Sequence, residues 1–358
     1  MSYRIGLDAL NLRPTPRVGH TEYCSNDALK RAVTGLPDDD PERDAKFYRL
    51  WEYDFIWSTN DGPEPWEERG RTTDMGHSDF LEGGVDRRPP KECPFRTVEE
   101  AWAFDAVAEY GLTERDRLIA YYEDLYRQAR RRYSEQVWTG GYYRTLVSGA
   151  IAIYGWDMLL QVASDRKRFA RVLDTIFAQS MHHYRAWAAT SIEAFMCHDD
   201  MVWSQGPFMH PDFYRSEIFP RYKELWAVIK QAGKKVVFTS DGDWSMFVDD
   251  IVEAGADALC FEPMMALEPV VEKYGESHCL IASKVDARTL TFGSRAQIQA
   301  EIDATLPLAA RCKGFIFAVG NHIPSNVPVE NALFYMDYLK RHWWRQGGQS
   351  HGLEEASI

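Results

Sequence analysis

The C-terminal half of the chain alternates between short apolar runs and segments whose apolar residues recur with a helical period. Four of these runs end in polar turns, and they span Val236–Asp243, Ala258–Glu262, Leu280–Asp286 and Phe315–Pro324. Strand, polar turn and helix in repeated order are typical of a parallel α/β fold. In such folds the residues that follow each strand line one shared site. The pattern therefore predicts both a fold class and a place to look for chemistry.

The first part of the chain reads differently. Residues 1–100 are rich in proline and acidic turns, but their aromatic content is too high for a disordered segment. We interpret them as an irregular cap that includes the first strand of the body, at residues 20–23, with a helix over 27–34 and a strand pair over 47–58. Thr97 and Glu100 form a capping-box pattern that starts the next helix. Residues 101–345 then form the body, and 346–358 a polar tail.

Composition narrows the function classes. With 358 residues the chain can form one large barrel or two ordinary domains. Its formal net charge of −13 would repel phosphate backbones, so nucleic acid is not an expected partner. Apolar runs are too short to cross a bilayer, and the six cysteines contain no CxxC pair. We expect a reduced, cytoplasmic protein that is neither membrane-bound nor secreted.

Candidate site residues follow from position alone, because they come directly after predicted strands. After the four runs these are Asp241, Asp243, Glu262, Asp286, Asn321 and His322, and after an earlier apolar strand at 194–197 they are His198, Asp199 and Asp200. The alternative for each aspartate is a turn or a helix cap, and this alternative is favoured for Asp243. Glu22, near the predicted first strand, would face the same site or form a surface ion pair instead.

Asp241, Glu262 and His322 together form a possible metal constellation of two carboxylates and one imidazole. No tight ligand spacing supports it, so the hypothesis depends on the strand ends meeting in space. A carboxylate at the end of an apolar strand, as at Glu262, needs a cationic partner or has a raised pKa. The same three residues are the predicted catalytic groups.

These residues resemble the uroporphyrinogen decarboxylase superfamily, which also contains corrinoid-dependent methyltransferases. The resemblance covers residues 190–342 well and the first 190 loosely. It is carried by Asp199-Asp200, Ser204-Gln205-Gly206, Pro211–Tyr214, Phe219–Lys223, Gly233–Phe238, Ser240–Asp243, Ala254–Leu259, Asp286, Leu290, Asn321–Pro324 and Val327–Asn331. The resemblance implies a (β/α)8 barrel whose site lies at the C-terminal ends of the strands, and a homodimer by analogy.

The branch of the superfamily is indicated by which residues stand at the positions of the zinc ligands and of the arginine-rich loop found in other members. Members that methylate thiols hold zinc with a His-x-Cys pair and a later cysteine, and the matching positions here are Thr239, Asp241 and Asn321. Glu262 matches a carboxylate near that metal. Porphyrinogen decarboxylases carry an arginine-rich N-terminal loop, and the N-terminal segment here contains no such cluster. The resemblance therefore implies the methyl-donor branch, with zinc as a possible further cofactor.

A protein of this branch takes a methyl group from a small methylated substrate, such as a methoxylated aromatic, and passes it to a cobalamin. The chain has no Asp-x-His-x-x-Gly corrinoid motif, so the cobalamin would belong to a separate small corrinoid-binding protein. Four aromatic side chains and one amide are predicted to contact the substrate, namely Tyr23, Trp203, Phe208, Trp244 and Gln205. The alternatives are a decarboxylase of uroporphyrinogen or a smaller acid, and a barrel that binds without catalysis.

Overall fold

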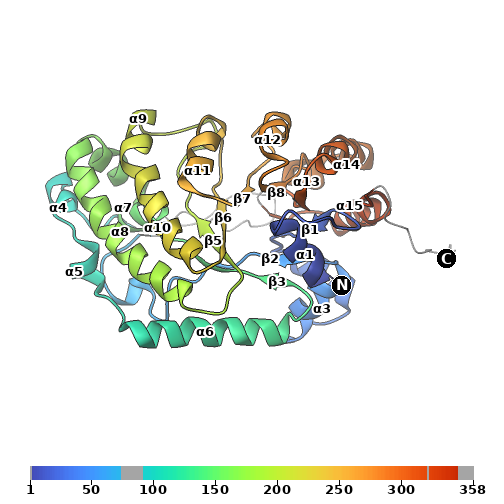
Figure 1. The fold of residues 1–358 in the computed structure, drawn as a ribbon, viewed down its shortest axis with the longest axis horizontal. Helices are drawn as coiled ribbons and strands as arrows, with labels where there is room; N and C mark the ends of the chain where they lie inside the picture. The colour runs from blue at the N-terminus through green and yellow to red at the C-terminus, as the bar shows by residue number, and fades with distance from the viewer. Residues whose placement is uncertain (1, 74–91, 321, 346–358) are drawn as a thin grey trace. The chain divides into compact units, whose positions relative to one another are not determined.

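The computed structural model describes residues 2–73, 92–320 and 322–345, and within them the chain forms two compact units. Unit 1 consists of residues 2–56, 135–137 and the described residues from 266 onward, and unit 2 of residues 57–134 and 138–265 within the described ranges. Both units contain parallel strands with helices between them in the chain (Figure 1). The predicted tail, 346–358, lies outside the described residues.

Unit 2 contains four parallel strands in the order β4-β5-β6-β7. The strands are β4 (Gly140–Tyr142), β5 (Ala194–His198), β6 (Lys235–Thr239) and β7 (Ala258–Cys260). Its helices are α4 (Val98–Trp102), α5 (Ala106–Tyr110), α6 (Arg115–Arg132), α7 (Val147–Ala163), α8 (Arg166–Ala188), α9 (Pro211–Phe213), α10 (Phe219–Gln231) and α11 (Val248–Ala254), with short turns η1 (Trp66–Glu68), η2 (Tyr214–Ile218) and η3 (Ser245–Phe247). Figure 1 shows α10 beside α8, and α10 also packs on β6.

Unit 1 contains three parallel strands in the order β1-β9-β8. Its strands are β1 (Gly19–His20), β2 (Phe55–Ile56), β8 (Cys279–Ala282) and β9 (Gly314–Phe317), and of β3 (Val137–Trp138) the first residue belongs to unit 1 and the second to unit 2. Its helices are α1 (Ser2–Leu10), α2 (Asp27–Thr34), α3 (Arg43–Leu50), α12 (Leu267–Tyr274), α13 (Ala287–Phe292), α14 (Arg295–Ala310) and α15 (Val329–His342). A strand forms where the first one was predicted, but it is shorter and begins one residue earlier than the predicted 20–23, because only Gly19 and His20 pair in parallel with Ile316 and Phe317.

Strands β6, β8 and β9 are apolar over most of their length, since both of their faces are covered. Val236, Val237 and Phe238 of β6 are fully buried. Parallel strands covered on both faces show this continuous pattern instead of alternating polar and apolar residues. This is why the C-terminal strands could be recognised as apolar runs in the sequence.

Helix starts follow the local sequence. Asn26 caps α2 by accepting a hydrogen bond from the Leu29 amide, and Thr97 caps α4 through the Glu100 amide. The predicted capping box at α4 forms only in part, because the Glu100 carboxylate accepts from the Arg96 amide rather than from Thr97.

The predicted strand pair over 47–58 was wrong. These residues contain the end of α3 and only the short strand β2, since Phe47 and Trp51 stack on one another along a helical turn. The division into a cap, 1–100, and a body, 101–345, stays a prediction. Each of the two compact units contains residues from the predicted cap and from the predicted body. Among the described residues no helix combines the length and apolarity needed to span a bilayer, and no cysteine forms a disulfide.

Candidate functional site

Three carboxylates lie in a row at the carboxyl ends of β5, β6 and β7. His198 pairs with Thr239 across β5 and β6, and Thr239 pairs with Cys260 across β6 and β7. Asp200 lies two residues after His198, Asp241 two residues after Thr239, and Glu262 two residues after Cys260. Because register places equivalent positions side by side, these acidic residues leave the strands at the same level. We call Asp200, Asp241 and Glu262 the carboxylate row.

His198, the last residue of β5, is bound to this row. Its Nε2 lies 3.2 Å from Oδ1 of Asp200, and the same oxygen accepts a hydrogen bond of 3.0 Å from the Asp241 amide. One ligand atom from each of His198, Asp200 and Asp241 lies within 4.8 Å of the others. The structure thus brings together three residues that the sequence predicted to lie in the site, although only Asp241 belonged to the predicted metal constellation.

Tyr143, just beyond β4, was missed by sequence reasoning. Its hydroxyl donates a 2.7 Å hydrogen bond to Oδ2 of Asp200, and its ring lies 4.1 Å from the ring of His198. Trp57 also stacks on His198, with 6.0 Å between ring centroids. The strand before Tyr143 contains Gly140 and Gly141, which carry no β-strand signal, so nothing in the sequence marked this position as a strand end.

Glycine at position 242 allows the tight turn after β6 that follows Asp241. Gly242 has φ +86°, and a Cβ there would lie 2.4 Å from the Trp203 carbonyl oxygen. Its amide donates a 2.8 Å hydrogen bond to Oε2 of Glu262. The turn therefore connects Asp241 to Glu262 by way of the backbone, and only glycine adopts this conformation in the available space.

The charges of the cluster are set by burial and by its own members. Burial lowers the pKa of His198, but Asp200 and Asp241 outweigh this effect, so that the pKa lies above its ordinary value. Burial raises the pKa of Asp200, yet the His198 imidazole and the hydrogen bonds to its oxygens hold it below the usual range. Burial and the Asp200 carboxylate raise the pKa of Tyr143. The cluster therefore favours a charged His198 beside a charged Asp200, with a neutral tyrosine.

Asp199 occupies a different environment from its neighbour. It is fully buried, and its oxygens accept hydrogen bonds from the amides of Leu146, Val147 and Ser148 at the start of α7 and from the Tyr222 hydroxyl. These four donors saturate the carboxylate. Asp199, predicted to contact substrate, therefore serves as a structural anchor for the N-terminus of α7.

An aromatic surface lies in the same unit. The rings of Trp156, Trp203 and Phe208 contact one another, with centroids 5.3–5.8 Å apart. Trp203 is 45% exposed. It begins a tight turn in which Trp203 and Gly206 exchange two backbone hydrogen bonds, with exposed Gln205 between them. Trp156 was not among the predicted residues.

Other predicted residues of unit 2 have local structural roles. Trp244 is fully buried against Phe238 and Phe261, so it belongs to the core instead of an open wall. Asp243 accepts a 3.0 Å hydrogen bond from the Ser245 amide, which stabilises the turn before η3, although the N-cap position of η3 itself is Trp244.

The remaining predicted residues belong to unit 1. Glu22 is buried and contacts His20 Nε2, the Val319 amide and the Tyr335 hydroxyl, and Asp286 caps α13 and pairs with Arg288. Tyr23 is 57% exposed, and its ring lies 6.0 Å from that of His322. Burial lowers the pKa of His322. Asn321 lies outside the described residues, and the grouping of His322 with Asp241 and Glu262 stays a prediction.

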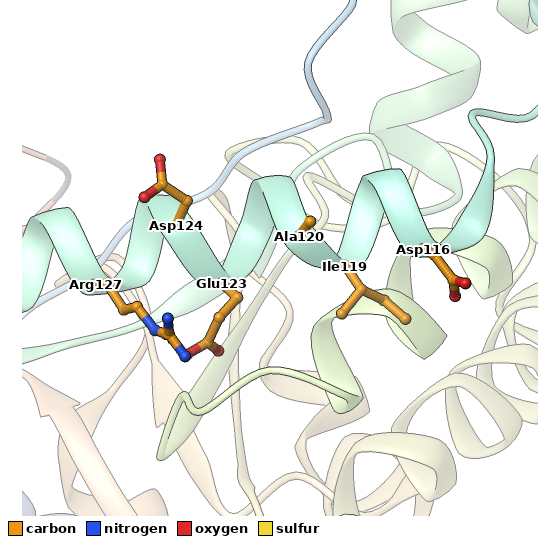
Figure 2. A pocket seen from close by; sticks show the side chains of 6 residues that line it. All are labelled: Asp116, Ile119, Ala120, Glu123, Asp124 and Arg127. Atoms are coloured by element: carbon orange, nitrogen blue, oxygen red, sulfur yellow. The ribbon is translucent and has the colours of Figure 1, made fainter.

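A surface hollow of about 450 Å³ lies along α6, apart from these groups. Its lining residues, Asp116, Ile119, Ala120, Glu123, Asp124 and Arg127, all come from this one helix (Figure 2). Figure 2 shows Glu123 beside Arg127, and the two form an ion pair at 2.8 Å. A hollow on one exposed helix has none of the converging groups of a catalytic site.

Comparison with known proteins finds both curated relatives and a solved structure of similar fold. Two curated proteins named uroporphyrinogen decarboxylase, from Pelobacter propionicus and Syntrophotalea carbinolica, are each 25% identical over 173 residues, 48% of this chain and 49% and 48% of their own lengths. The match thus spans about half the length of these relatives. A solved methyltransferase from Methanosarcina mazei has the same fold, with a TM-score of 0.67 and 17% identity over 95% of this chain and 98% of that one.

The family assignment rests on a longer match. The uroporphyrinogen decarboxylase (URO-D) family model matches residues 153–342, more than half of the chain, and this range contains the carboxylate row, His198 and Trp203. Together with the structural match, it confirms the predicted fold class, a parallel (β/α)8 barrel. The chain belongs to the uroporphyrinogen decarboxylase family.

Proposed function

We propose that this protein is a methyltransferase that takes a methyl group from a small methylated substrate, with a methoxylated aromatic favoured, and delivers it to the cobalamin of a separate corrinoid protein. The observation that carries the proposal is the carboxylate row with His198 at the strand ends, in the same unit as an exposed aromatic surface. Family membership and the fold shared with a methyltransferase support it.

The reaction sets clear requirements for the protein. The bond between the methyl carbon and the ether oxygen would break, and the oxygen would leave with the electron pair of that bond. The reduced cobalt of the acceptor would supply the electron pair for the new bond to the methyl carbon. That oxygen must be protonated or bound to a Lewis acid, because an alkoxide or phenolate is otherwise a poor leaving group. His198, Asp200 and Asp241 form the polar cluster suited to this task, since their atoms converge on one point.

The aromatic surface would position the substrate. Trp203 has nearly half of its surface exposed, and the rings of Trp156 and Phe208 contact its ring. A methoxylated ring can stack on this surface with offset or edge contacts, which are worth about 0.5–1.5 kcal/mol beyond the area buried. Stacking would restrict the methyl group to a narrow range of directions, as in-line displacement requires.

Decarboxylation of a porphyrinogen is the second candidate, because the curated relatives carry that name. A substrate with many carboxylates needs several cations for binding. The strand ends of unit 2 instead present Asp200, Asp241 and Glu262 in a row. Three carboxylates close together would repel a polyanion, so the charge of this site favours an uncharged or weakly charged methyl donor.

An assay with free cob(I)alamin tests the proposal. We expect the purified protein to convert cob(I)alamin to its methylated form, followed by absorbance, with at least one donor from a panel of methoxyarenes and methylamines. Uroporphyrinogen without corrinoid is the parallel reaction, followed by release of carbon dioxide. Carbon dioxide release together with no methyl transfer from any donor would favour the decarboxylase instead.

A further inference from the structure

We propose that His198, Asp200 and Asp241 bind one divalent cation, with zinc as the matching ion. The role of the ion in activating a leaving oxygen rests on the proposed methyl transfer, but the binding itself does not. This set differs from the constellation of Asp241, Glu262 and His322 indicated by the sequence, since two of its three members come from the end of β5.

The distances fit a shared ion. Ligands at about 2.0–2.1 Å from a tetrahedral zinc lie about 3.3 Å from one another. Nε2 of His198 and Oδ1 of Asp200 are 3.2 Å apart, and an oxygen of Asp241 lies within 4.8 Å of both. A zinc ion can therefore join the first two atoms without moving them apart, and rotation of the more exposed Asp241 side chain brings in the third.

The surrounding contacts orient the ligands. The Tyr143 hydroxyl donates to Oδ2 of Asp200, and the Ser148 hydroxyl accepts from the Asp200 amide at 2.7 Å. The ring of Trp57 stacks on the imidazole of His198, and the tilted ring of Tyr143 contacts it with 4.1 Å between ring centroids. Contacts of this kind, which fix a ligand's orientation from outside the metal's own shell, accompany metal sites in proteins and change affinity by about 10–100-fold.

The donor set selects the type of metal. One imidazole and two carboxylates suit zinc and similar transition ions, whereas calcium and magnesium prefer oxygen ligands alone. Cys260 pairs with Thr239 on the neighbouring strand, but it is not one of the residues whose ligand atoms converge. Three protein ligands leave a fourth tetrahedral position for a substrate oxygen, the arrangement typical of catalytic rather than structural zinc.

Binding of the ion should displace a proton. Nε2 of His198 and Oδ1 of Asp200 lie at hydrogen-bonding distance, so a proton between them occupies the place of the metal. Only the neutral imidazole can be a ligand, and zinc therefore competes with this proton. Proton release on zinc binding distinguishes this site from a loose association of zinc with surface carboxylates.

Zinc binding to chelator-stripped protein tests the proposal without any methyl donor. We expect one zinc per chain in competition with a chromophoric chelator, and proton release in calorimetry repeated in two buffers. His198→Ala and Asp241→Asn should each weaken binding at least 100-fold, and Tyr143→Phe about 10-fold. The matched control is His210, whose Nδ1 lies 3.6 Å from Asp212 in an exposed pair of similar spacing, so His210→Ala should leave binding unchanged.

Two results would overturn the site: no stoichiometric zinc in the stripped and reloaded protein, or equal affinity in His198→Ala, Asp241→Asn and the control. Thermal melting confirms that each variant is folded. Because no donor is present, zinc can bind as proposed even if every methyl-transfer assay fails, and the two proposals are tested separately.

Discussion

At the scale of single residues, the adjacent aspartates Asp199 and Asp200 show how strongly the surroundings decide a role. The first is saturated by three amides of α7 and the Tyr222 hydroxyl, while the second joins His198 and Asp241. In the sequence both follow the same strand and both were predicted to lie in the site. The two side chains reach different partners from adjacent positions just after β5, so the direction of each side chain decides its role.

Asp199→Ala should destabilise the protein without acting on chemistry directly. It removes the acceptor of several buried donors, so we expect the free energy of unfolding to fall by about 2–4 kcal/mol. Urea denaturation measures this change, and Asp212→Ala, in an exposed pair, should stay within about 0.5 kcal/mol of the wild type. Unchanged stability with lost methyl transfer would instead assign Asp199 to substrate contact.

The titration of His198 gives a second residue-scale prediction. In metal-free protein, burial lowers the pKa of His198, but the negative charges of Asp200 and Asp241, and to a smaller extent Asp199, outweigh it and raise the pKa above the ordinary value. A raised folded-state pKa means that charged His198 contributes stability that is fully present below about pH 6.5 and is lost as pH rises through the folded pKa.

Asp200→Asn should reverse this shift. Burial lowers the pKa of His198, and the Asp200 carboxylate is the largest effect that raises it. Without that carboxylate, the titration midpoint of His198 should fall below the ordinary value. NMR of labelled imidazole carbons measures the midpoint, with exposed His210 as the internal reference. A His198 midpoint that is the same in both proteins would show that Asp200 does not control its charge.

At the scale of elements, the parallel register of β5, β6 and β7 explains why acidic residues far apart in sequence form a row. Apolar runs and polar ends were visible in the sequence, so these strands and their order along the chain could be predicted. The row itself could not, because it depends on which residues pair across strands. β4 was missed, since its glycines show no strand preference.

Gly242→Ala should disturb the turn that joins Asp241 to Glu262. The variant must accept both a positive φ and a Cβ that would lie 2.4 Å from the Trp203 carbonyl oxygen, so we expect a loss of about 2–4 kcal/mol. Gly233 is the matched control, because it has φ +76° and a Cβ added there would meet no atom within 4 Å. Its alanine variant should lose about 1–2 kcal/mol. Equal losses in chemical denaturation would contradict the crowding argument.

The tight turn from Trp203 to Gly206 contains Trp203 and Gln205, two of the residues predicted to contact the substrate. Trp203→Ala should raise KM for a methoxylated aromatic about 10-fold while changing kcat less, because a lost stacking and burial contribution of roughly 1–2 kcal/mol acts mainly on binding. Steady-state kinetics separates the two constants. Phe292→Ala, at a site 78% exposed in unit 1, is the control, and an equal effect there would remove Trp203 from the substrate surface.

At the scale of the whole molecule, the sequence predicted the fold class but not the division of the described residues into two compact units. The fold class followed from strand and helix alternation, and the family match agrees with it. Of the three predicted catalytic residues, Asp241 and Glu262 leave neighbouring strands of unit 2, while His322 lies beside Tyr23 in unit 1. His198 emerged as the imidazole of the cluster because cross-strand register and ring stacking, neither visible in a linear sequence, place it there.

The most direct test of the proposed function follows a labelled methyl carbon. A ¹³C-methoxylated aromatic that serves as donor is mixed with cob(I)alamin and the protein, and the label is followed by NMR. We expect the label to move from oxygen to cobalt with one demethylated product per methyl transferred, and Asp241→Asn and Glu262→Gln to lose this transfer while remaining folded. Label that stays on oxygen with every donor, or moves equally fast in the two variants, would contradict methyl transfer at the carboxylate row.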